Sequence, residues 1–318
     1  MSAIDFHVML NASSGTALAA GVTAEALVTQ FGDLGYRISI DADASQPFER
    51  RLLAARNSSA PVLVAAGGDG TVTAQAREAG ETGKRLAVLP LGTANLLARD
   101  LNLPLELDQW FAALPNFHER EIDFGEVNGR IFLHKVVIGA VPGIAVVREK
   151  IRGNGTIGAR LSFVSHFFRA LSRVRRFAVE VTSEAGEPVI HRVHAIAVAN
   201  NDYEEGFGKV FARSRLDAGF LSLYLVRSLS PGDALRLGLE MLLGTWRNDE
   251  AIEIESVRAV TVRTRRRRVR AMIDGEVGMI DGPFEFRIHP LGLKVLAGPV
   301  VAEAGEAAGG AAPLEATG

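Results

Sequence analysis

The residues best suited to chemistry lie in one short stretch, residues 67–71, which read Gly-Gly-Asp-Gly-Thr. They follow an apolar run of strand length at residues 61–66 and precede a helical pattern that begins at Val72. Such a helix N-terminus binds phosphate, because its backbone N–H groups and the positive end of the helix dipole face the anion. A carboxylate there repels phosphate unless a cation bridges the two or the carboxylate handles a proton. Asp69 therefore suggests phosphoryl transfer, although a glycine turn can also serve only to tighten a strand-to-helix corner.

Two further polar turns follow apolar runs of strand length. Residues 11–15 read Asn-Ala-Ser-Ser-Gly, and residues 90–95 read Pro-Leu-Gly-Thr-Ala-Asn. Their amides, hydroxyls and glycines suit uncharged donation to phosphate oxygens and to a nucleotide base. None of the three turns matches the P-loop pattern or the dinucleotide pattern Gly-x-Gly-x-x-Gly. The predicted site is therefore neither a P-loop nor a dinucleotide site.

Strand-like and helical runs alternate over the first 122 residues. Strands are expected at residues 4–10, 37–40, 61–66 and 85–89, and helices at residues 23–34, 47–56, 72–79 and 94–101. This alternation predicts an α/β domain with a parallel, doubly wound sheet, whose ligand crevice lies at the carboxyl ends of the strands. All three polar turns fall on that edge, so we expect them to meet there.

Short strands dominate residues 123–300 and predict a mainly antiparallel β-sandwich or barrel-like second domain. The alternating run at residues 122–132 contains the hairpin signal Asn128-Gly129. Further strands are expected at residues 177–182, 194–199, 220–226, 251–256, 259–264 and 269–273, and helices at residues 157–172 and 230–244. The final strand could return to the first domain. Residues 301–318, rich in Ala and Gly, are expected to be disordered.

The composition excludes several classes of site and partner. The chain has no cysteine, and so no disulfide, thiolate metal site or cysteine nucleophile. Its net charge of −2 gives no overall positive field to recruit nucleic acid. We see no signal peptide, and the longest apolar stretch, residues 136–147, is shorter than the roughly 20 residues of a membrane-spanning helix. The seven histidines show no metal-ligand spacing. We expect a cytoplasmic protein, at most peripheral at the inner face of the membrane.

In combination, the three turns resemble the catalytic domain of the diacylglycerol kinases, a family that includes sphingosine kinases and bacterial lipid kinases. The family's late Asp-Gly-Glu is matched by residues 274–276, and the resemblance extends to about residue 300. NAD kinases and 6-phosphofructokinases share the Gly-Gly-Asp-Gly piece alone. The resemblance implies a nucleotide domain at residues 1–122, a lipid-substrate domain at residues 123–300, and an active site in the cleft between them. It also implies ATP and Mg²⁺.

The resemblance gives the matching residues their roles. Asp69 would lie beside magnesium and the transferring phosphoryl group, and Glu276 would be the general base that takes the proton from the lipid hydroxyl. From sequence alone, residues 274 and 275 can equally be an Asp-Gly hairpin turn. The nucleotide would be bound by Asn11, Ser13, Ser14, Gly15, Gly67, Gly68, Asp69, Gly70, Thr71, Gly92, Thr93 and Asn95.

The chain departs from the family pattern at several polar positions. Ala12 replaces a proline of the first turn. The family continues hydrophobic-Asn-Glu after its Gly-Gly-Asp-Gly-Thr, where this chain has Thr73 and Ala74. Leu96 stands where the family keeps an Asp, and Asp100, on the same helical face, could partly compensate.

A further departure lies in the second domain. The family often has Leu-Asp-Asp-Gly, whose second Asp holds a structural magnesium ion. Residues 216–219 of this chain read Leu-Asp-Ala-Gly instead. A structural magnesium at Asp217 is therefore in doubt.

Residues 263–270 hold six arginines in eight positions. Strand alternation would divide them between two faces, with Arg263, Arg265 and Arg267 on one and Arg266, Arg268 and Arg270 on the other. One interpretation is a solvated edge strand guarded by charge. The other is attraction to anionic phospholipid headgroups, because the run lies shortly before Glu276 and would turn the active site towards the bilayer. Nucleic acid is the least favoured partner, since no aromatic residue interleaves the arginines.

Together these patterns predict an ATP-dependent lipid kinase that transfers the γ-phosphate to a lipid hydroxyl, with diacylglycerol as the default acceptor. Phe163, Phe167, Phe168 and residues 136–147 are candidates for the acceptor groove, and core packing explains them equally well. Two alternatives stay open, an NAD-kinase-like enzyme with a soluble acceptor and a pseudokinase that only binds nucleotide or lipid. A homodimer is compatible with the sequence.

Overall fold

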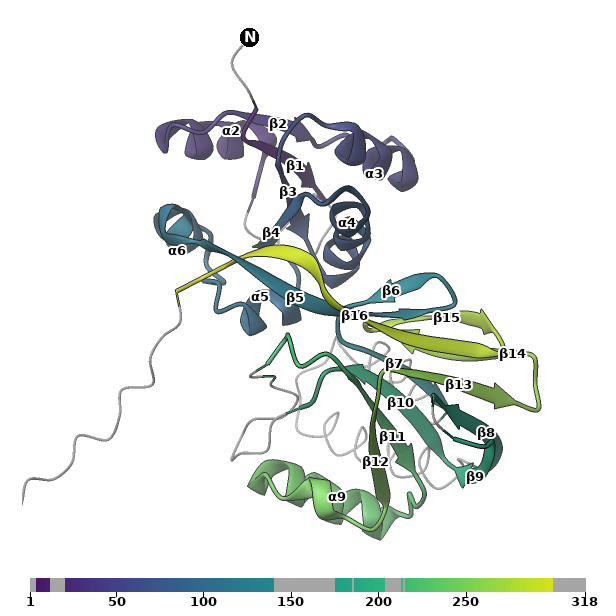
Figure 1. Cartoon of the computed structure of the whole chain (residues 1–318). Coiled ribbons are helices and arrows are strands. Elements are labelled where there is room, and N and C mark those ends of the chain that lie inside the picture. The colour runs from purple at the N-terminus through teal and green to yellow at the C-terminus, as the bar shows by residue number, and fades with distance from the viewer. Residues whose placement is uncertain are drawn as a thin grey trace, which may run out of the picture.

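The computed structural model describes residues 4–11, 21–139, 175–184, 186–203, 213 and 215–299. The predictions for the helix at residues 157–172, for Phe163, Phe167 and Phe168, and for the tail at residues 301–318 lie outside these residues. Figure 1 shows an upper part with the N-terminal elements, a lower part built of strands, and two strands, β5 and β16, that run between them.

The upper part holds four parallel strands in the order β2-β1-β3-β4. The strands are β1 Phe6–Leu10, β2 Ile38–Asp41, β3 Val62–Gly67 and β4 Arg85–Pro90. The helices are α2 Ala24–Asp33, α3 Phe48–Asn57, α4 Asp69–Thr82, α5 Leu96–Asp100, α6 Leu107–Ala113 and the short 3-10 helix η1 Leu114–Asn116. Every residue of β3 is buried, as is usual for a parallel strand covered by helices. The predicted parallel, doubly wound sheet is confirmed.

Helix α4 begins at Asp69, three residues before the predicted start at Val72. Apolar spacing marks a helix only from its first core residue, and the polar residues before Val72 carry no such signal. Gly68 precedes the helix with extended backbone (ψ −179°). The polar residues of the turn therefore form the first turn of the helix, at the positive end of its dipole.

The lower part is a sandwich of two sheets. One sheet is antiparallel, in the order β12-β11-β10-β7-β14-β15. Its strands are β7 Lys135–Gly139, β10 Ala195–Asn200, β11 Leu221–Val226, β12 Ile252–Val257, β14 Arg268–Ile273 and β15 Glu276–Asp281. The short 3-10 helix η2, Trp246–Asn248, precedes β12 in the chain. The facing layer contains β5 His118–Val127, β6 Arg130–Phe132, β8 Phe177–Ser183, β9 Val189–Val193, β13 Ala259–Thr264 and β16 Phe284–Ala297. Side chains of both layers, such as Ile138, Val198, Val181 and Phe284, pack in one buried cluster, so the predicted β-sandwich is confirmed.

Strand β16 connects the two parts. Its first half pairs antiparallel with β13 of the sandwich, and Val295 near its end pairs in parallel with Leu86 of β4. One ten-stranded sheet therefore runs through both parts, with β5 alongside β16 (Figure 1). Since β5 itself begins at His118 and crosses residue 122, the division of the chain at that residue stays a prediction.

Helix α9, Pro231–Leu243, confirms the helix predicted at residues 230–244. A capping box of Ser230 and Asp233 fixes its start, and Gly244 in the left-handed conformation (φ 75°) ends it. Within the described residues, none of the helices combines the length and the apolar character needed to cross a membrane.

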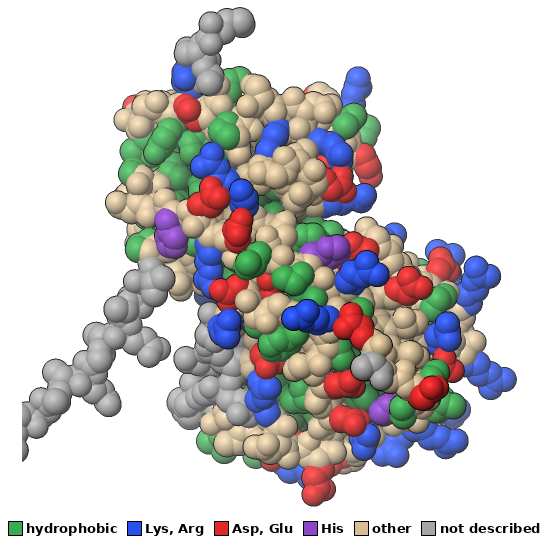
Figure 2. Space-filling model, in the orientation of Figure 1, with side chains coloured by type: hydrophobic (Ala, Val, Ile, Leu, Met, Phe, Trp, Pro, Cys, Tyr) green, Lys and Arg blue, Asp and Glu red, His purple; other side chains and the backbone are tan. Residues whose placement is uncertain are grey.

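The arginines of residues 263–270 do not form one strand. β13 ends at Thr264 in one sheet and β14 begins at Arg268 in the other, so the residues between them form a bend. The predicted alternation does not hold over the whole run, because the bend at residues 265–267 separates β13 of one sheet from β14 of the other. All six arginine side chains are exposed, and Lys and Arg side chains gather along this right-hand edge of the lower part (Figure 2).

Candidate active site

Strands β1, β3 and β4 end side by side at one edge of the parallel sheet. Asn11, directly after β1, donates its backbone N–H to Ala66 O (2.8 Å) and its side-chain amide to Oγ1 of Thr71 (3.1 Å). Leu91, directly after β4, donates its N–H to Gly67 O (3.1 Å). The first and third turns are thus bonded to the second. The rest of the first turn, with Ser13, Ser14 and Gly15, lies outside the described residues.

Two glycines are required by close packing of the turns. A Cβ on Gly67 would lie 2.7 Å from Oγ1 of Thr71, and a Cβ on Gly92 would lie 2.5 Å from Cα of Gly68. Real Cβ atoms do not approach other atoms so closely. Gly67 therefore leaves room for the Thr71 side chain of its own turn, and Gly92 lets the third turn touch the second. The glycines here therefore serve packing as well as access for a ligand.

The N-terminus of α4 is open towards this edge. No side chain of the described residues caps the helix at Gly68. The first hydrogen bond of the helix runs from the N–H of Val72 to Gly68 O (3.1 Å). The N–H groups of residues 69–71 therefore have no partner within the helix and point out of its end. The dipole of a 14-residue helix favours an anion at this point, which fits the predicted phosphate site.

Asp69 ties two turns together and keeps one oxygen for a ligand. Its Oδ1 accepts the backbone N–H of Leu96 at the start of α5 (2.8 Å), and among the described residues no hydrogen bond reaches Oδ2. Within the described part of the chain, no three or more His, Asp or Glu side chains come together to form a metal site by themselves. Proteins commonly hold Mg²⁺ with one or two carboxylates plus substrate phosphates. Asp69 therefore fits a magnesium ion shared with a nucleotide.

Asn95 stabilises its own turn. Its Oδ1 accepts the N–H of Gly92 (2.8 Å), and its Nδ2 donates to Gly92 O (2.9 Å) and Pro90 O (3.4 Å). The residue is buried in the left-handed conformation (φ 49°), where Asn is tolerated better than most side chains. These bonds engage the amide that the sequence offers to the nucleotide, whereas Thr93 of the same turn is exposed.

Glu276 reaches the start of α4 from the second domain. Asp274 (φ 46°) and Gly275 (φ 93°) form the two-residue turn between β14 and β15, so the hairpin interpretation of the Asp-Gly pair is correct. The turn presents Glu276 to the first domain, where its carboxylate lies so close to Gly70 that a Cβ there would collide with Oε1. Residues of the second turn and the predicted general base are thereby brought together.

Asp274 is a buried anchor of the same turn. Its carboxylate accepts three successive backbone N–H groups, from Leu133 (2.6 Å), His134 (2.9 Å) and Lys135 (2.9 Å), and the hydroxyl of Thr73 (3.1 Å). Burial raises the pKa of Asp274, and the hydrogen bonds that it accepts oppose this rise. Thr73, which stands where the family keeps Asn, therefore forms a hydrogen bond from the first domain to Asp274 of the second.

Asp100 does not replace the acidic residues that the third turn lacks. It is buried against Arg213 of the second domain, whose Nε and Nη2 donate to its Oδ2 at 3.1 and 2.5 Å. Burial raises the pKa of Asp100, and the positive charge of Arg213 opposes the rise. Arg213 also donates to Leu133 O (2.7 Å), so this ion pair ties α5 to the second domain. Sequence reasoning missed Arg213, because an isolated arginine gives no signal of burial.

Two further basic residues, the buried His134 and the half-buried Lys135, lie near Arg213. Its Nη2 lies 2.9 Å from Nδ1 of His134, and burial lowers the pKa of that histidine well below its usual value. Burial also lowers the pKa of Lys135 to about 8, an effect that Asp274 opposes. Nζ of Lys135 lies 5.1 Å from the ring centroid of Tyr203, a cation–π contact. Lys135 was not a sequence-based candidate, since it stands within an apolar strand.

Protein hydrogen bonds hold the corner at residues 216–219. Fully buried Asp123 accepts the N–H groups of Gly219 (2.7 Å) and Leu291 (2.8 Å), one on each carboxylate oxygen. Asn201 accepts the N–H of Ala218 (3.1 Å). Asp217 is exposed beside Arg215 (3.5 Å). These residues do not fit a structural magnesium ion at Asp217.

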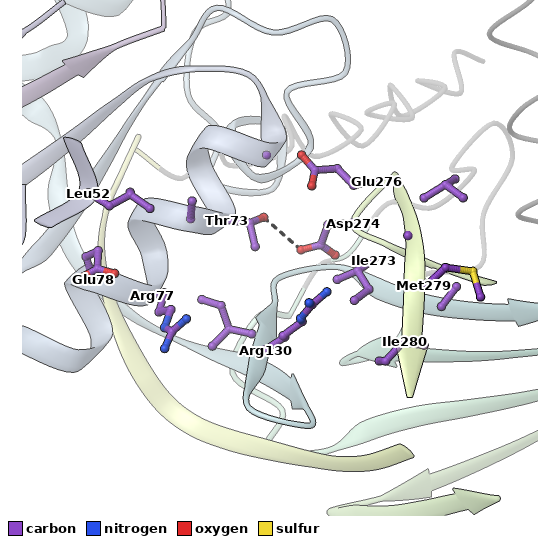
Figure 3. Close-up of a pocket in the computed structure, with 16 residues that line it drawn as sticks. Leu52, Thr73, Arg77, Glu78, Arg130, Ile273, Asp274, Glu276, Met279 and Ile280 are labelled. Carbon is purple, nitrogen blue, oxygen red and sulfur yellow. Dashed lines mark hydrogen bonds between the residues drawn. The ribbon is translucent and has the colours of Figure 1, made fainter. Parts of the chain in front are cut away.

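A cavity of about 320 Å³ lies between α4 and the β14–β15 hairpin (Figure 3). Gly70 and Glu276 belong to its lining. The other polar lining residues include Thr73, Arg77, Glu78, Arg130 and Asp274, and the apolar ones Leu52, Ile131, Ile273, Val277, Met279 and Ile280. Of the predicted acceptor groove at residues 136–147, only the first four residues are described, and Val136 and Ile138 are packed in the sandwich core.

Two family models match the chain in succession. Residues 5–127 match the diacylglycerol kinase catalytic domain, and residues 142–297 match the YegS C-terminal NAD kinase beta sandwich-like domain. Together they cover both parts of the fold described above.

Individual relatives agree with these matches. A diacylglycerol kinase of Bacillus subtilis is 28% identical over 229 residues, which are 70% of this chain and 74% of the relative. A probable lipid kinase YegS-like of Pseudomonas aeruginosa is 44% identical over 101 residues, 31% of this chain and 32% of the relative. A solved structure of a putative diacylglycerol kinase of Bacillus anthracis has a TM-score of 0.69 at 16% identity and covers 95% of this chain and 100% of its own. At that identity the likeness supports the fold alone.

Proposed function

The chain belongs to the diacylglycerol kinase catalytic-domain family, and on this premise we propose that it is an ATP-dependent lipid kinase. The reaction would transfer the γ-phosphate of ATP to a lipid hydroxyl, with diacylglycerol as the first acceptor to test. The observation that carries the proposal is the contact of the Glu276 carboxylate with Gly70, at the open N-terminus of α4.

The nucleotide phosphates would be bound by the first turn of α4. Its N–H groups and dipole favour an anion. The Asn11 amide donates to Thr71, and the Asn95 side chain accepts the N–H of Gly92, which holds the surrounding turns. Asp69 offers one oxygen to a magnesium ion. Bound with the phosphates, that ion would neutralise the negative charge that develops during transfer.

Glu276 would act as the general base. As the lipid hydroxyl oxygen forms its bond to the γ-phosphorus, its proton passes to the Glu276 carboxylate and the bond from the γ-phosphorus to the bridging oxygen of ADP breaks. The carboxylate is exposed to the cavity and close to the helix end where the phosphates would lie. Phosphoryl transfer asks little more of a protein than this positioning and charge neutralisation.

A lipid acceptor is supported by the chemistry of the cavity. One side of it is formed by apolar residues of β14 and β15, including Ile273, Met279 and Ile280 (Figure 3). Such a wall suits the hydrocarbon part of an acceptor next to its hydroxyl. The relatives whose printed names specify diacylglycerol kinase or lipid kinase support the same class of acceptor.

Membrane contact through the arginines of residues 263–270 remains a proposal. All six are exposed at one edge of the lower part, where anionic headgroups would attract them. Arg268 and Glu276 lie at opposite ends of the β14–β15 hairpin, roughly 17 Å apart along β14, and Arg270 lies two residues nearer the turn. We propose that the protein acts in the cytoplasm, at the inner face of the membrane. Sedimentation with phosphatidylglycerol vesicles that equals sedimentation with phosphatidylcholine vesicles would refute this contact.

A non-catalytic binding role is the second candidate, and it rests on the polar residues that the chain lacks. Two of these departures keep a hydrogen bond across the site, since Thr73 donates to Asp274 and the backbone of Leu96 donates to Asp69. These two hydrogen bonds therefore favour a catalytic site over one that only binds nucleotide or lipid.

The proposed function is tested by incubating the protein with labelled ATP, Mg²⁺ and a panel of acceptors. The panel contains diacylglycerols, sphingoid bases and ceramides in mixed micelles, together with soluble acceptors such as NAD. We expect a labelled lipid phosphomonoester. Label on a soluble acceptor would support an NAD-kinase-like enzyme, and label on no acceptor would support the binding role.

A further inference from the structure

Two contacts join the start of α4 to the Asp-Gly-Glu turn of the second domain. The Glu276 carboxylate lies against Gly70, and Oγ1 of Thr73 donates to Oδ2 of Asp274 (3.1 Å). Gly70 and Thr73 are three residues apart, so the two contacts are one helical turn apart on the same face of α4. Figure 3 shows the Thr73–Asp274 bond beside Glu276.

Asp274 is held firmly on its own side of the cleft. Its carboxylate accepts the backbone N–H groups of Leu133, His134 and Lys135, and its own N–H donates to Lys135 O (3.0 Å). Among the described residues, the hydroxyl of Thr73 is its hydrogen-bond partner from the first domain. A shift of this bond would therefore move the whole turn relative to α4.

Glu276 is held less firmly. It is exposed and begins β15, which is an edge strand of its sheet. No hydrogen bond or ion pair of its carboxylate occurs among the described residues. Its place over the N-terminus of α4 is therefore set by where the preceding turn docks, and the Thr73–Asp274 hydrogen bond is the contact of that turn with α4.

We propose that the Thr73–Asp274 hydrogen bond positions Glu276 for proton transfer, which makes Thr73 a positioning residue of this site. The proposal rests on the proposed function. Thr73 does not act on the reacting atoms itself, because its hydroxyl is engaged with Asp274. It acts through the turn, and a displacement of about 1 Å at a catalytic group can cost a hundredfold in rate.

The test replaces the hydroxyl while keeping the shape of the side chain. Thr73→Val should lower kcat for lipid phosphorylation by about 10- to 100-fold with the KM for ATP changed less than about threefold. Thr73→Ala, a second variant without the donor, should show the same fall. Thr73→Ser keeps the donor and should restore most of kcat.

Thr82→Val is the matched control. Thr82 lies on the same helix, and its hydroxyl donates to the helix backbone at Glu78 O (2.6 Å) and Ala79 O (3.4 Å). This variant should keep the wild-type kcat.

Several results would overturn the proposal. They are a wild-type kcat in Thr73→Val or Thr73→Ala, an equal fall in Thr73→Ser or Thr82→Val, and loss of the fold in both donor-less variants. A wild-type protein that phosphorylates no lipid would instead refute the proposed function, and this proposal with it.

Discussion

At the scale of single residues, the site depends on a glycine that leaves room for a carboxylate. Gly70 lies in the first turn of α4, and the Glu276 carboxylate from the other domain occupies the space that a Cβ would fill. Neighbouring glycines have other tasks, since Gly67 and Gly92 allow the turns to pack. The glycines within residues 67–70 are therefore required for different physical reasons at different positions.

Gly70→Ala tests this contact. The added Cβ would displace Glu276, so we expect kcat to fall by at least about tenfold, while helix propensity alone would stabilise the protein by about 0.5–1 kcal/mol. Gly80→Ala on the same helix is the control, because its Cβ would meet only ordinary contacts, 3.6 Å from Gly292 O and 3.8 Å from Phe124. Equal activity of Gly70→Ala and Gly80→Ala would contradict the assignment.

Lys135 should give stability a dependence on pH. Its pKa falls from 10.5 to about 8 on folding, because burial disfavours the charged form. Between these pH values the unfolded chain binds the extra proton, so the free energy of unfolding rises with pH in this window. Urea unfolding from pH 7.5 to 9.5 should show wild type gaining stability relative to Lys135→Met. A constant difference between the two proteins would show that Lys135 has an ordinary pKa.

At the scale of elements, hydrogen bonds within the protein hold the corner at residues 216–219. The two carboxylate oxygens of Asp123 accept the backbone N–H groups of Gly219 and Leu291, and the side chain of Asn201 accepts the N–H of Ala218. Buried donors and acceptors that are satisfied in this way need no cation.

The stability of the nucleotide-free protein should therefore not depend on magnesium. We expect its thermal midpoint to differ by less than about 1 °C between 5 mM MgCl₂ and 5 mM EDTA, whereas Asp123→Ala should unfold at lower temperature because it leaves buried N–H groups unpaired. A midpoint that falls in EDTA by several degrees would reveal a structural metal that the described residues do not account for.

The sequence predicts elements well where periodicity and turn chemistry agree. Strand β3, the hairpin at Asn128 and helix α9 with its Ser230 cap follow from such local signals. The bounds of strand β16 were not predicted, because Pro290 and Gly292 interrupt its pattern where the strand is irregular. The two strands on either side of the arginine run were predicted nearly at their observed bounds, but nothing local marks the passage from one sheet to the other between them.

The candidate site was predictable only in part. Asp69 and Gly70 stood out from the glycine turn itself, Glu276 was found through motif resemblance, and the parallel sheet explains why the turns meet. The Thr73–Asp274 and Asp100–Arg213 contacts join residues far apart in sequence. Such pairs depend on how the domains pack, which single-residue patterns do not encode.

At the scale of the whole molecule, three kinds of connection place the two parts around one cleft. Strands β5 and β16 run through both, the Asp100–Arg213 ion pair is buried between them, and Thr73 bonds to Asp274 beside the cavity. A base from one domain can therefore work on phosphates bound by the other. This arrangement is the central claim for the molecule.

The most direct test measures transfer of the labelled γ-phosphate from ATP to the lipid acceptor by wild-type protein and by Glu276→Gln. The substitution removes the base and keeps the size of the side chain, so we predict a kcat lowered by about 10²–10⁴-fold with little change in ATP binding. Wild-type kcat in Glu276→Gln, in a protein that phosphorylates lipid, would contradict the account, because the proton of the acceptor would then have to pass to another group.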